Sequence, residues 1–437
     1  MGRIVCKFGG SSVADHHQFR KVKAIVAADP RRRVIVVSAP GKRHKNEAKI
    51  TDLLYLCHEM AAMGTDFSAP FNQLRDRYLE IERELGLATP LAAQLRAFRD
   101  EIAAGHAKDY IASRGEYFSG LLMAAYLNAE FVDPQEYVII DAFGNVDPAT
   151  YDLLGKRLAN DRVCYVMPGF YGRDHHGTVK TFSRGGSDIS GALAARAIMA
   201  ELYENWTDVS GLLMADPRIV DNPCHMDQVT YREIRELSYM GASVFHDEAI
   251  LPVREAKIPI NIKNTNRPQD AGTFIVPVFR ESKYKIAGIA GKKNFSMIGI
   301  EKSLMNKEVG FGYKVLGVLE SHGISYEHCP SSIGTMSVIL EDRALNDKAD
   351  LVVEELKRAV QPDKIEVVRG LALIAVVGEE MANTVGMAAQ VFAALASAGV
   401  NVRIINQGAS ELNIIIGVNS ADYENSVRAL YKAFVTF

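Results

Sequence analysis

The C-terminal third of the chain repeats one pattern of apolar and polar residues, and this repeat restricts the possible folds more than any single motif does. Segments 311–340 and 386–418 each read as an amphipathic helix, a glycine that ends it, an alternating strand, a polar turn and a second strand. The offset between the helix-ending glycines, Gly323 and Gly399, is kept through the strands that follow. The sequence therefore predicts two copies of one small α/β unit.

The rest of the chain alternates short apolar runs with helical stretches. Runs rich in β-branched residues at 33–40, 137–141, 163–170 and 258–264 are typical of buried strands. Their alternation with helices favours a mostly parallel sheet with helices on both faces. Residues 66–130 have helical periodicity without a strand pattern, which indicates a helical insertion beside the sheet.

The character of the sequence changes after "RPQDAGTF" at 267–274, a run of turn-forming residues. We therefore expect two regions, and the second should hold the repeat. The expected bounds are a first domain at 1–282, with its insertion at about 66–130, and a region at 283–437 with units at about 297–365 and 370–437.

Composition narrows the classes of function. The chain has 437 residues with a net charge of −3 and no long basic run, which argues against a nucleic-acid partner. Its five cysteines lie far apart without a CxxC motif, so we expect free thiols and the cytoplasm. No signal-type or membrane-spanning apolar run occurs, so we expect neither export nor membrane insertion. The partner should be a small molecule.

The first motif with chemical meaning is "VCKFGGSSVAD" at 5–15. An apolar strand ends here on Lys7, followed by Gly9, Gly10 and Ser11. Paired glycines allow close approach of the backbone, and their N–H groups can bind an anion such as a phosphate. The alternative is a strand-to-helix turn with a solvated lysine, and this stretch alone leaves it open.

The second motif is "TFSRGGSDISGALAARAI" at 181–198. It places an arginine and two glycines directly before an alanine-rich helix, and a helix N-terminus next to arginine binds carboxylates well. Helix capping alone would explain Ser187 and Asp188, but not Arg184 and the glycines. Two such sites suit an enzyme that holds two anionic substrates. No GxxxxGK[ST] motif occurs, and phosphoryl transfer needs charge neutralisation and positioning more than a nucleophile.

These motifs also occur together with "VVSAP" before "TDLL", "SRGE" at 113–116, "TDVSG" and "ADPR". In this order, and with the C-terminal repeat, they resemble the aspartokinases of the amino acid kinase superfamily in their monofunctional form. The resemblance implies an amino acid kinase fold followed by tandem ACT units of βαββαβ, ferredoxin-like topology. It also implies that ATP phosphorylates L-aspartate to 4-phospho-L-aspartate, the first step toward lysine, threonine and methionine.

The resemblance assigns roles to residues of this chain. Lys7 would neutralise charge on the transferred phosphoryl group, and Asp188 would orient Lys7. The ATP-binding candidates are Lys7, Gly9, Gly10, Ser11, Thr207, Asp208, Asp216, Arg218, Asn266 and Arg267. The aspartate-binding candidates are Ser38, Thr51, Glu116, Phe170, Arg184, Gly185, Gly186 and Ser187, with Arg184 on the α-carboxylate and Glu116 on the α-ammonium. Mg²⁺ would be held by the ATP phosphates without a protein cage.

One departure from the family pattern concerns the segment "GKRHKNEAKI" at 41–50. It is longer and more basic than the usual link between "SAP" and "TDLL". This departure affects the expected placement of Thr51 in the substrate pocket. The composition of the segment alone predicts no role for it.

The resemblance also implies control by an amino acid, most simply L-lysine, bound where ACT-like units of two chains meet. We expect a homodimer through this region, or a dimer of such dimers. The effector candidates are Met305, Gly310, Phe311, Ser325, Tyr326 and Glu327, and the carboxylate of Glu327 would accept an ammonium group.

Two other functions stay open at this level. One is another amino acid kinase that acts on glutamate, acetylglutamate or UMP, although the arginine cluster and paired ACT-like units favour aspartate. The other is a non-catalytic amino-acid sensor, which retention of Lys7, Arg184 and Asp188 argues against.

Overall fold

The computed structural model describes residues 2–183, 185–242, 247–278 and 283–435. The chain divides into two compact units, which we call unit 1 and unit 2. Unit 1 comprises residues 1–212, 225–231 and 243–279, and unit 2 comprises residues 213–224, 232–242 and 280–437.

Unit 1 is built on an eight-stranded sheet in the order β3-β4-β2-β1-β7-β9-β10-β8. Every neighbouring pair is parallel except β9 and β10, which confirms the expected α/β class with a mostly parallel sheet. The strands are β1 Ile4–Phe8, β2 Arg32–Val37, β3 Glu130–Phe131, β4 Tyr165–Pro168, β7 Leu202–Thr207, β8 Gln228–Thr230, β9 Ile260–Asn264 and β10 Thr273–Val276, and a separate hairpin joins β5 Tyr171–Arg173 to β6 Val179–Thr181.

Strand β1 shows how the two faces of this sheet are used. Successive side chains of a strand point to opposite faces. Cys6 and Phe8 pack with Phe19 and Val22 of helix α1 (His16–Ala28) in the main apolar core. Lys7 therefore points to the other face, where helix α8 (Gly186–Ala197) lies against the strand. One face of the strand is therefore apolar and buried, and the other places the charge of Lys7 beside α8.

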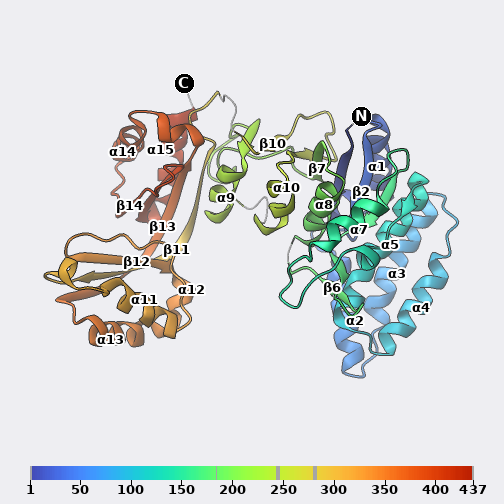
Figure 1. Cartoon of the computed structure of the whole chain (residues 1–437), viewed down its shortest axis with the longest axis horizontal. Helices are drawn as coiled ribbons and strands as arrows, with labels where there is room; N and C mark the ends of the chain where they lie inside the picture. Colours follow the sequence, from blue (N-terminus) through green and yellow to red (C-terminus); the bar gives the residue numbers. More distant parts are fainter. Residues whose placement is uncertain (1, 184, 243–246, 279–282, 436–437) are drawn as a thin grey trace. The chain divides into compact units, whose positions relative to one another are not determined.

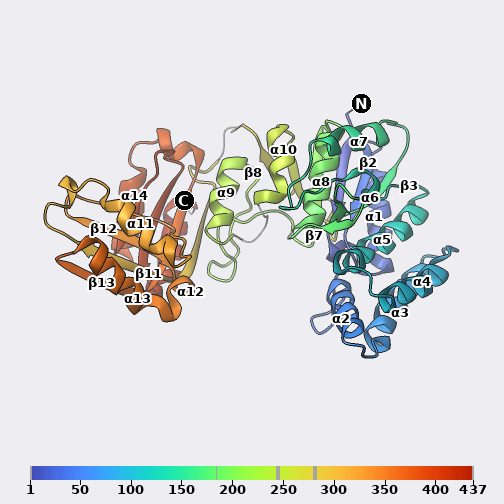
Figure 2. The same ribbon diagram turned by 60° about the horizontal axis from the view of Figure 1, so that its bottom comes forward.

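The predicted helical insertion at about 66–130 contains helices α3, α4 and α5, and α2 precedes it. These four helices pack together at one end of unit 1 (Figures 1 and 2). They are α2 Ile50–Ala62, α3 Ser68–Glu84, α4 Leu91–Ala103 and α5 Lys108–Leu127. Rings of Phe71, Tyr78, Phe98 and Phe118 contact one another between α3, α4 and α5, with centroids 5.5–6.3 Å apart. Apolar residues at helical spacing form this core, as amphipathic helices require.

The strand predicted at 137–141 is wrong. Pro134–Tyr137 instead forms the short helix α6, whose first turn is capped by the Asp133 carboxylate on the Gln135 N–H. Only isolated bridges follow, from Ile139 and Ile140. Helix α6 takes Tyr137 from the predicted run, and of the remaining residues only Ile139 and Ile140 pair, each with a different segment.

Unit 2 contains an antiparallel five-stranded sheet in the order β12-β11-β13-β15-β14. Strands β11 and β13, each of 14 residues, run through both halves of the repeat. Helices α11 and α13 lie at one end of these strands, and α14 and α15 lie at the other (Figure 1). The elements are β11 Gly288–Glu301, β12 Thr335–Glu341, β13 Lys364–Val377, β14 Ile404–Asn406, β15 Asn413–Asn419, α11 Phe311–Ser321, α13 Ala349–Val360, α14 Met387–Ser397 and α15 Tyr423–Val435.

The two copies of the sequence repeat have the same backbone conformation at the glycines that flank their first helices. Gly310 and Gly386, which precede α11 and α14, have φ of +80° and +92°, and Gly323 and Gly399, which follow these helices, have φ of +65° and +70°. The copies differ after the first helix, because residues 324–332 form only isolated bridges where the second copy has strand β14. The first expected strand of this copy is therefore absent from the described residues.

All five cysteines are free thiols. Among the residues that the structure describes, no helix combines the length and the apolar character needed to cross a membrane.

Candidate active site

The predicted site residues of unit 1 gather where the parallel strands end. Strands β4, β2, β1, β7 and β9 are neighbours and run in one direction, so their carboxyl ends share an edge, where α/β sheets bind ligands. Phe170 and Ser38 follow β4 and β2, Lys7 lies near the end of β1, and Thr207 and Asn266 lie at or beyond the ends of β7 and β9. The acceptor and nucleotide candidates therefore lie on opposite sides of Lys7.

Lys7 is held by a partly buried ion pair at the centre of this edge. Its Nζ lies 2.6 Å from Oδ1 of Asp188, and only 10% of the lysine side chain is exposed. Asn205 Nδ2 donates to the same oxygen at 2.7 Å. Asn205 is the residue of β7 paired with Lys7, so strand pairing places the amide beside the ion pair. Sequence reasoning missed Asn205, and only knowledge of the β1–β7 register could have found it.

The glycine pair after β1 differs in part from the prediction. The Gly9 N–H donates to the Trp206 carbonyl at 3.0 Å, so it is engaged within the protein and not free for a phosphate. The following turn η1 (Gly10–Val13) begins at Gly10, and the first N–H groups of a helical turn have no partner within it. Gly10 and Ser11 are therefore the better phosphate donors. Ser12 fixes the turn, because its hydroxyl lies 2.7 Å from that of Thr265.

The start of helix α8 packs closely on the loop after β4. Gly185 caps the helix with φ of +60°, and a Cβ on Gly186 would lie 2.6 Å from the Phe170 ring. Phe170 itself has φ of +78°, which is uncommon for a non-glycine residue. A Cβ on Gly169 would lie 2.7 Å from Ser187, so glycine is needed there too. Arg184, the predicted carboxylate clamp, lies outside the described residues.

Glu116 of α5 is a buried carboxyl group on the acceptor side. The residue is only 6% exposed, and burial raises its pKa to about 8, although the Ala39 N–H donates to it. Its Oε2 finds no hydrogen-bond partner among the residues that the structure describes. Burying an unpaired polar atom is costly, so this oxygen is suited to a charged ligand group.

Thr51 is the second residue of α2 and is half-buried. The preceding Ile50 lies close to Gly115, because a Cβ on Gly115 would lie 3.5 Å from its Cγ2. Helix α2 therefore begins beside the turn of α5 that carries Glu116.

Four nucleotide candidates lie together beyond β7 and β9. The Thr265 N–H donates to the Thr207 carbonyl at 2.9 Å, and the Thr207 hydroxyl donates to Asp208 at 3.1 Å. Asn266 Oδ1 accepts from Lys21 Nζ at 2.6 Å, and the exposed Arg267 follows. These contacts place the two loops side by side.

Asp216 and Arg218, the other two nucleotide candidates, lie in unit 2. Their side chains pair with each other at 2.6 Å, the arginine is 86% exposed, and segment 213–224 belongs to unit 2. Their contact with a nucleotide stays a prediction.

The effector candidates in unit 2 fall into two groups. Met305 and Phe311 lie in the apolar core of the first ACT-like half, so their side chains pack mainly against other apolar residues, and their contact with an effector stays a prediction. Gly310 caps α11, and Ser325 and Tyr326 are exposed.

Glu327, the expected ammonium acceptor, has a partner inside unit 2. Its Oε2 accepts a hydrogen bond from the hydroxyl of Tyr239, the last residue of helix α9 (Tyr231–Tyr239), whose residues from 232 on belong to unit 2. Burial, followed by the carboxylate of Glu327, raises the pKa of Tyr239. A ligand ammonium would therefore have to share this carboxylate with a phenol.

Comparisons with known proteins agree with this architecture. The amino acid kinase family matches residues 2–264, and an ACT domain family matches residues 374–434. These matches define an amino acid kinase that carries an ACT domain.

The individual relatives narrow the class. Aspartokinase 3 of Bacillus subtilis is 39% identical over 446 residues, which cover 98% of each chain. The crystal structure of Clostridium acetobutylicum aspartate kinase has a TM-score of 0.92 and 48% identity and covers 99% of this chain and 100% of that one. Escherichia coli aspartokinase III, in complex with aspartate and ADP, has a TM-score of 0.75, 27% identity and 99% coverage of both chains. The chain belongs to the aspartokinases.

Proposed function

We propose that the chain transfers the γ-phosphoryl group of ATP to the β-carboxylate of L-aspartate, which yields ADP and 4-phospho-L-aspartate. The observation that carries the proposal is the Lys7–Asp188 pair, which lies between acceptor and nucleotide candidates at the carboxyl edge of one sheet and has a buried lysine. Positioning and charge neutralisation are what phosphoryl transfer chiefly requires. E. coli aspartokinase III, solved with aspartate and ADP, supports the choice of substrates.

Each residue then has a role. Lys7 neutralises charge on the transferred group, while Asp188 holds Lys7 and does not act as a base, because the β-carboxylate is already ionised at pH 7. Glu116 binds the α-ammonium, and Arg184 binds the α-carboxylate. Ser38, Thr51, Phe170, Gly185, Gly186 and Ser187 complete the acceptor pocket, and Gly10, Ser11, Thr207, Asp208, Asn266 and Arg267 contact the nucleotide.

Mg²⁺ fits this site as an ion carried by the nucleotide. Within the described ranges, no three His, Cys, Asp or Glu side chains could hold a metal together. Asp188 is the carboxylate nearest Lys7, and its Oδ1 is occupied by Lys7 and Asn205. Mg²⁺ would supply charge neutralisation on the phosphate oxygens, which it binds readily with few protein ligands.

The same proposal includes regulation through residues 283–437. We infer that they form two ACT-like units that pair between two chains in the cytoplasm and bind an amino acid, with L-lysine as the first candidate. E. coli aspartokinase III in complex with lysine and aspartate supports this choice. The exposed Ser325 and Tyr326 beside Glu327 supply polar groups for such a ligand.

The reaction can be tested by trapping the acyl phosphate as a hydroxamate. We expect ATP-dependent product with L-aspartate, and none with glutamate or acetylglutamate. Product with another acceptor alone would replace the proposed substrate, and no product with any acceptor would favour the amino-acid sensor.

We predict that Glu327 and Tyr239 affect lysine inhibition in opposite directions. Glu327→Ala removes the ammonium acceptor and should raise the half-inhibitory lysine concentration about tenfold or more, within the usual range of allosteric coupling. Tyr239→Phe removes a competing donor and should lower this concentration. The exposed Glu320→Ala on α11 is the matched control. Equal inhibition of all variants, or a parent chain that ignores lysine, would reject this site.

A further inference from the structure

An arginine lies on the apolar side of helix α3. The buried positions of this helix include Phe71, Leu74, Tyr78 and Ile81, and Arg77 occupies the same stripe with 5% of its surface exposed. Burial lowers the pKa of Arg77 from its ordinary value. A charge in such a place is costly unless it makes specific contacts.

The contacts of Arg77 lead to the candidate active site. Its Nη2 donates to the carbonyl of Ala14, at 3.0 Å, and to the carbonyl of Gly41. Ala14 directly follows the turn η1 that carries the phosphate donors, and Gly41 lies in the loop that begins at Ser38. One guanidinium group therefore joins the nucleotide side to the acceptor side.

The two joined segments also touch each other. The Gly41 N–H donates to the Gly10 carbonyl at 2.8 Å, and a Cβ on Gly41 would lie 2.5 Å from the Gly10 carbonyl carbon. Because the two backbones pack this closely, a displacement of Gly41 would also displace Gly10.

The next residue of α3 reaches a third segment. The Tyr78 hydroxyl donates to the Gly115 carbonyl at 2.7 Å, one residue before Glu116. Arg77 and Tyr78 thus bind backbone carbonyls beside three parts of the candidate site. These parts are the turn η1, which we call the phosphate turn, the loop that begins at Ser38, which we call the acceptor loop, and Glu116.

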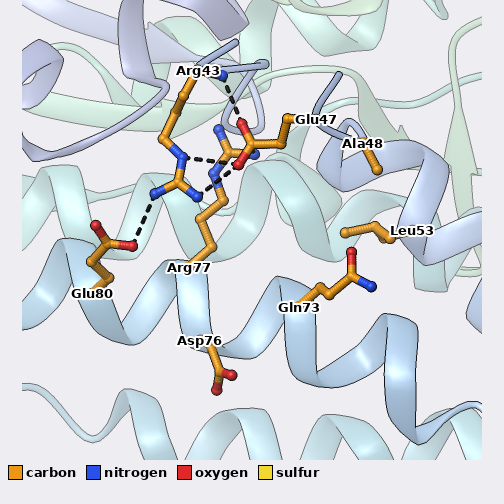
Figure 3. A pocket seen from close by; sticks show the side chains of 8 residues that line it. All are labelled: Arg43, Glu47, Ala48, Leu53, Gln73, Asp76, Arg77 and Glu80. Carbon is orange, nitrogen blue, oxygen red and sulfur yellow. Dashed lines mark hydrogen bonds and ion pairs between the residues drawn. The ribbon is translucent and has the colours of Figure 1, made fainter. Parts of the chain in front are cut away.

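The segment 41–50 supplies the counter-ion of Arg77. Glu47 Oε2 lies 3.3 Å from Arg77 Nη1, and Arg43 binds Glu47 at 2.7 Å and Glu80 at 2.9 Å (Figure 3). These side chains, together with Arg77, border a cavity of about 250 Å³ between the segment and α3.

We propose that Arg77 is a positioning residue of the kinase reaction, which holds the phosphate turn and the acceptor loop in register through the carbonyls of Ala14 and Gly41. This inference rests on the proposed function. Arg77 contacts no substrate in this scheme and acts through backbone geometry. A misplacement of about 1 Å can cost about 100-fold in rate.

The test compares substitutions of Arg77 with a matched control in the hydroxamate assay. We expect Arg77→Met to lower kcat/KM for both ATP and aspartate by about 100-fold. Its thermal midpoint should fall, because Glu47 and the two buried carbonyls lose this partner, so the rates are compared per folded protein. Arg77→Lys should keep most activity, since an ammonium can donate to both carbonyls. Arg83→Met, on the same helix with a 73% exposed side chain, should match the parent.

Chemical rescue separates positioning from folding. Arg77→Ala extends the cavity, so added methylguanidinium should restore part of its activity, while Lys7→Ala should not respond. Arg77→Met within about twofold of the parent would overturn the proposal, because misplaced loops should cost far more. The proposal would also be overturned if the activity of the Arg77 variants decreased only in proportion to the fraction of folded protein, with unchanged KM values and no rescue by methylguanidinium. A parent chain without kinase activity would instead overturn the proposed function, and with it this inference.

Discussion

Lys7→Ala is expected to lower kcat by about 100- to 1000-fold and to leave KM for aspartate nearly unchanged. A charge aimed at the transferred group acts mainly in the transition state, and removing one such preorganised group typically costs this much. Its low exposure and its 2.6 Å contact with Asp188 make Lys7 a preorganised charge. Steady-state kinetics at saturating ATP would measure the effect.

The control for this variant is Lys23→Ala. Lys23 lies on α1 and contacts the Tyr126 carbonyl at the surface, so its loss should leave kcat unchanged. Asp188→Asn should produce a smaller decrease than Lys7→Ala, because the amide can still accept a hydrogen bond from Lys7. If Lys7→Ala kept a kcat within about twofold of the parent, Lys7 would not be the group that stabilises the transition state.

Much of this centre could be predicted from local patterns. An apolar strand that ends on Lys7, and a glycine pair before the helix with Asp188, indicate anion sites without any tertiary information. Their direct contact depends on helix α8 covering the strand face to which Lys7 points. Asn205 and the Gly9–Trp206 contact could not be predicted, because both arise from the pairing of β1 with a strand far along the chain.

Arg77 shows another limit of sequence reasoning. Its spacing from Leu74 and Ile81 places it on a buried stripe, and a charge at such a position is a usable signal. Its partners cannot be found this way, because Ala14 and Gly41 contribute backbone carbonyls that no side-chain motif marks. The effector residues show the converse case. Family position suggested Phe311, but packing buries its side chain in the ACT-like core.

Glu116 should make the KM for aspartate depend on pH. Burial raises its pKa to about 8 in the free protein, and an ammonium ligand favours the ionised form. Binding of aspartate at lower pH must therefore remove a proton from Glu116. KM should fall as pH rises from about 6 to 8, by up to tenfold per unit, and should level off above pH 8.

The same carboxyl group should affect stability with the opposite sign. Between its ordinary pKa of 4.5 and about 8, folded Glu116 retains a proton that the unfolded chain has released. The free energy of unfolding should therefore decrease as pH rises through this window. Glu116→Gln should remove this contribution, which denaturant titrations at several pH values can measure without any substrate.

Glu116→Gln should raise KM for aspartate about 30-fold or more, because it removes the charge partner of a buried ammonium. The variant should also lose the dependence of KM on pH between about 6 and 8, since it has no group that titrates there. KM for ATP should change little, because Glu116 lies on the acceptor side of Lys7. Glu59→Gln, an exposed change on α2, is the control for added amide and lost charge. A parent KM that is flat across this window, together with a Glu116→Gln variant of normal aspartate affinity, would assign the ammonium of aspartate to another partner.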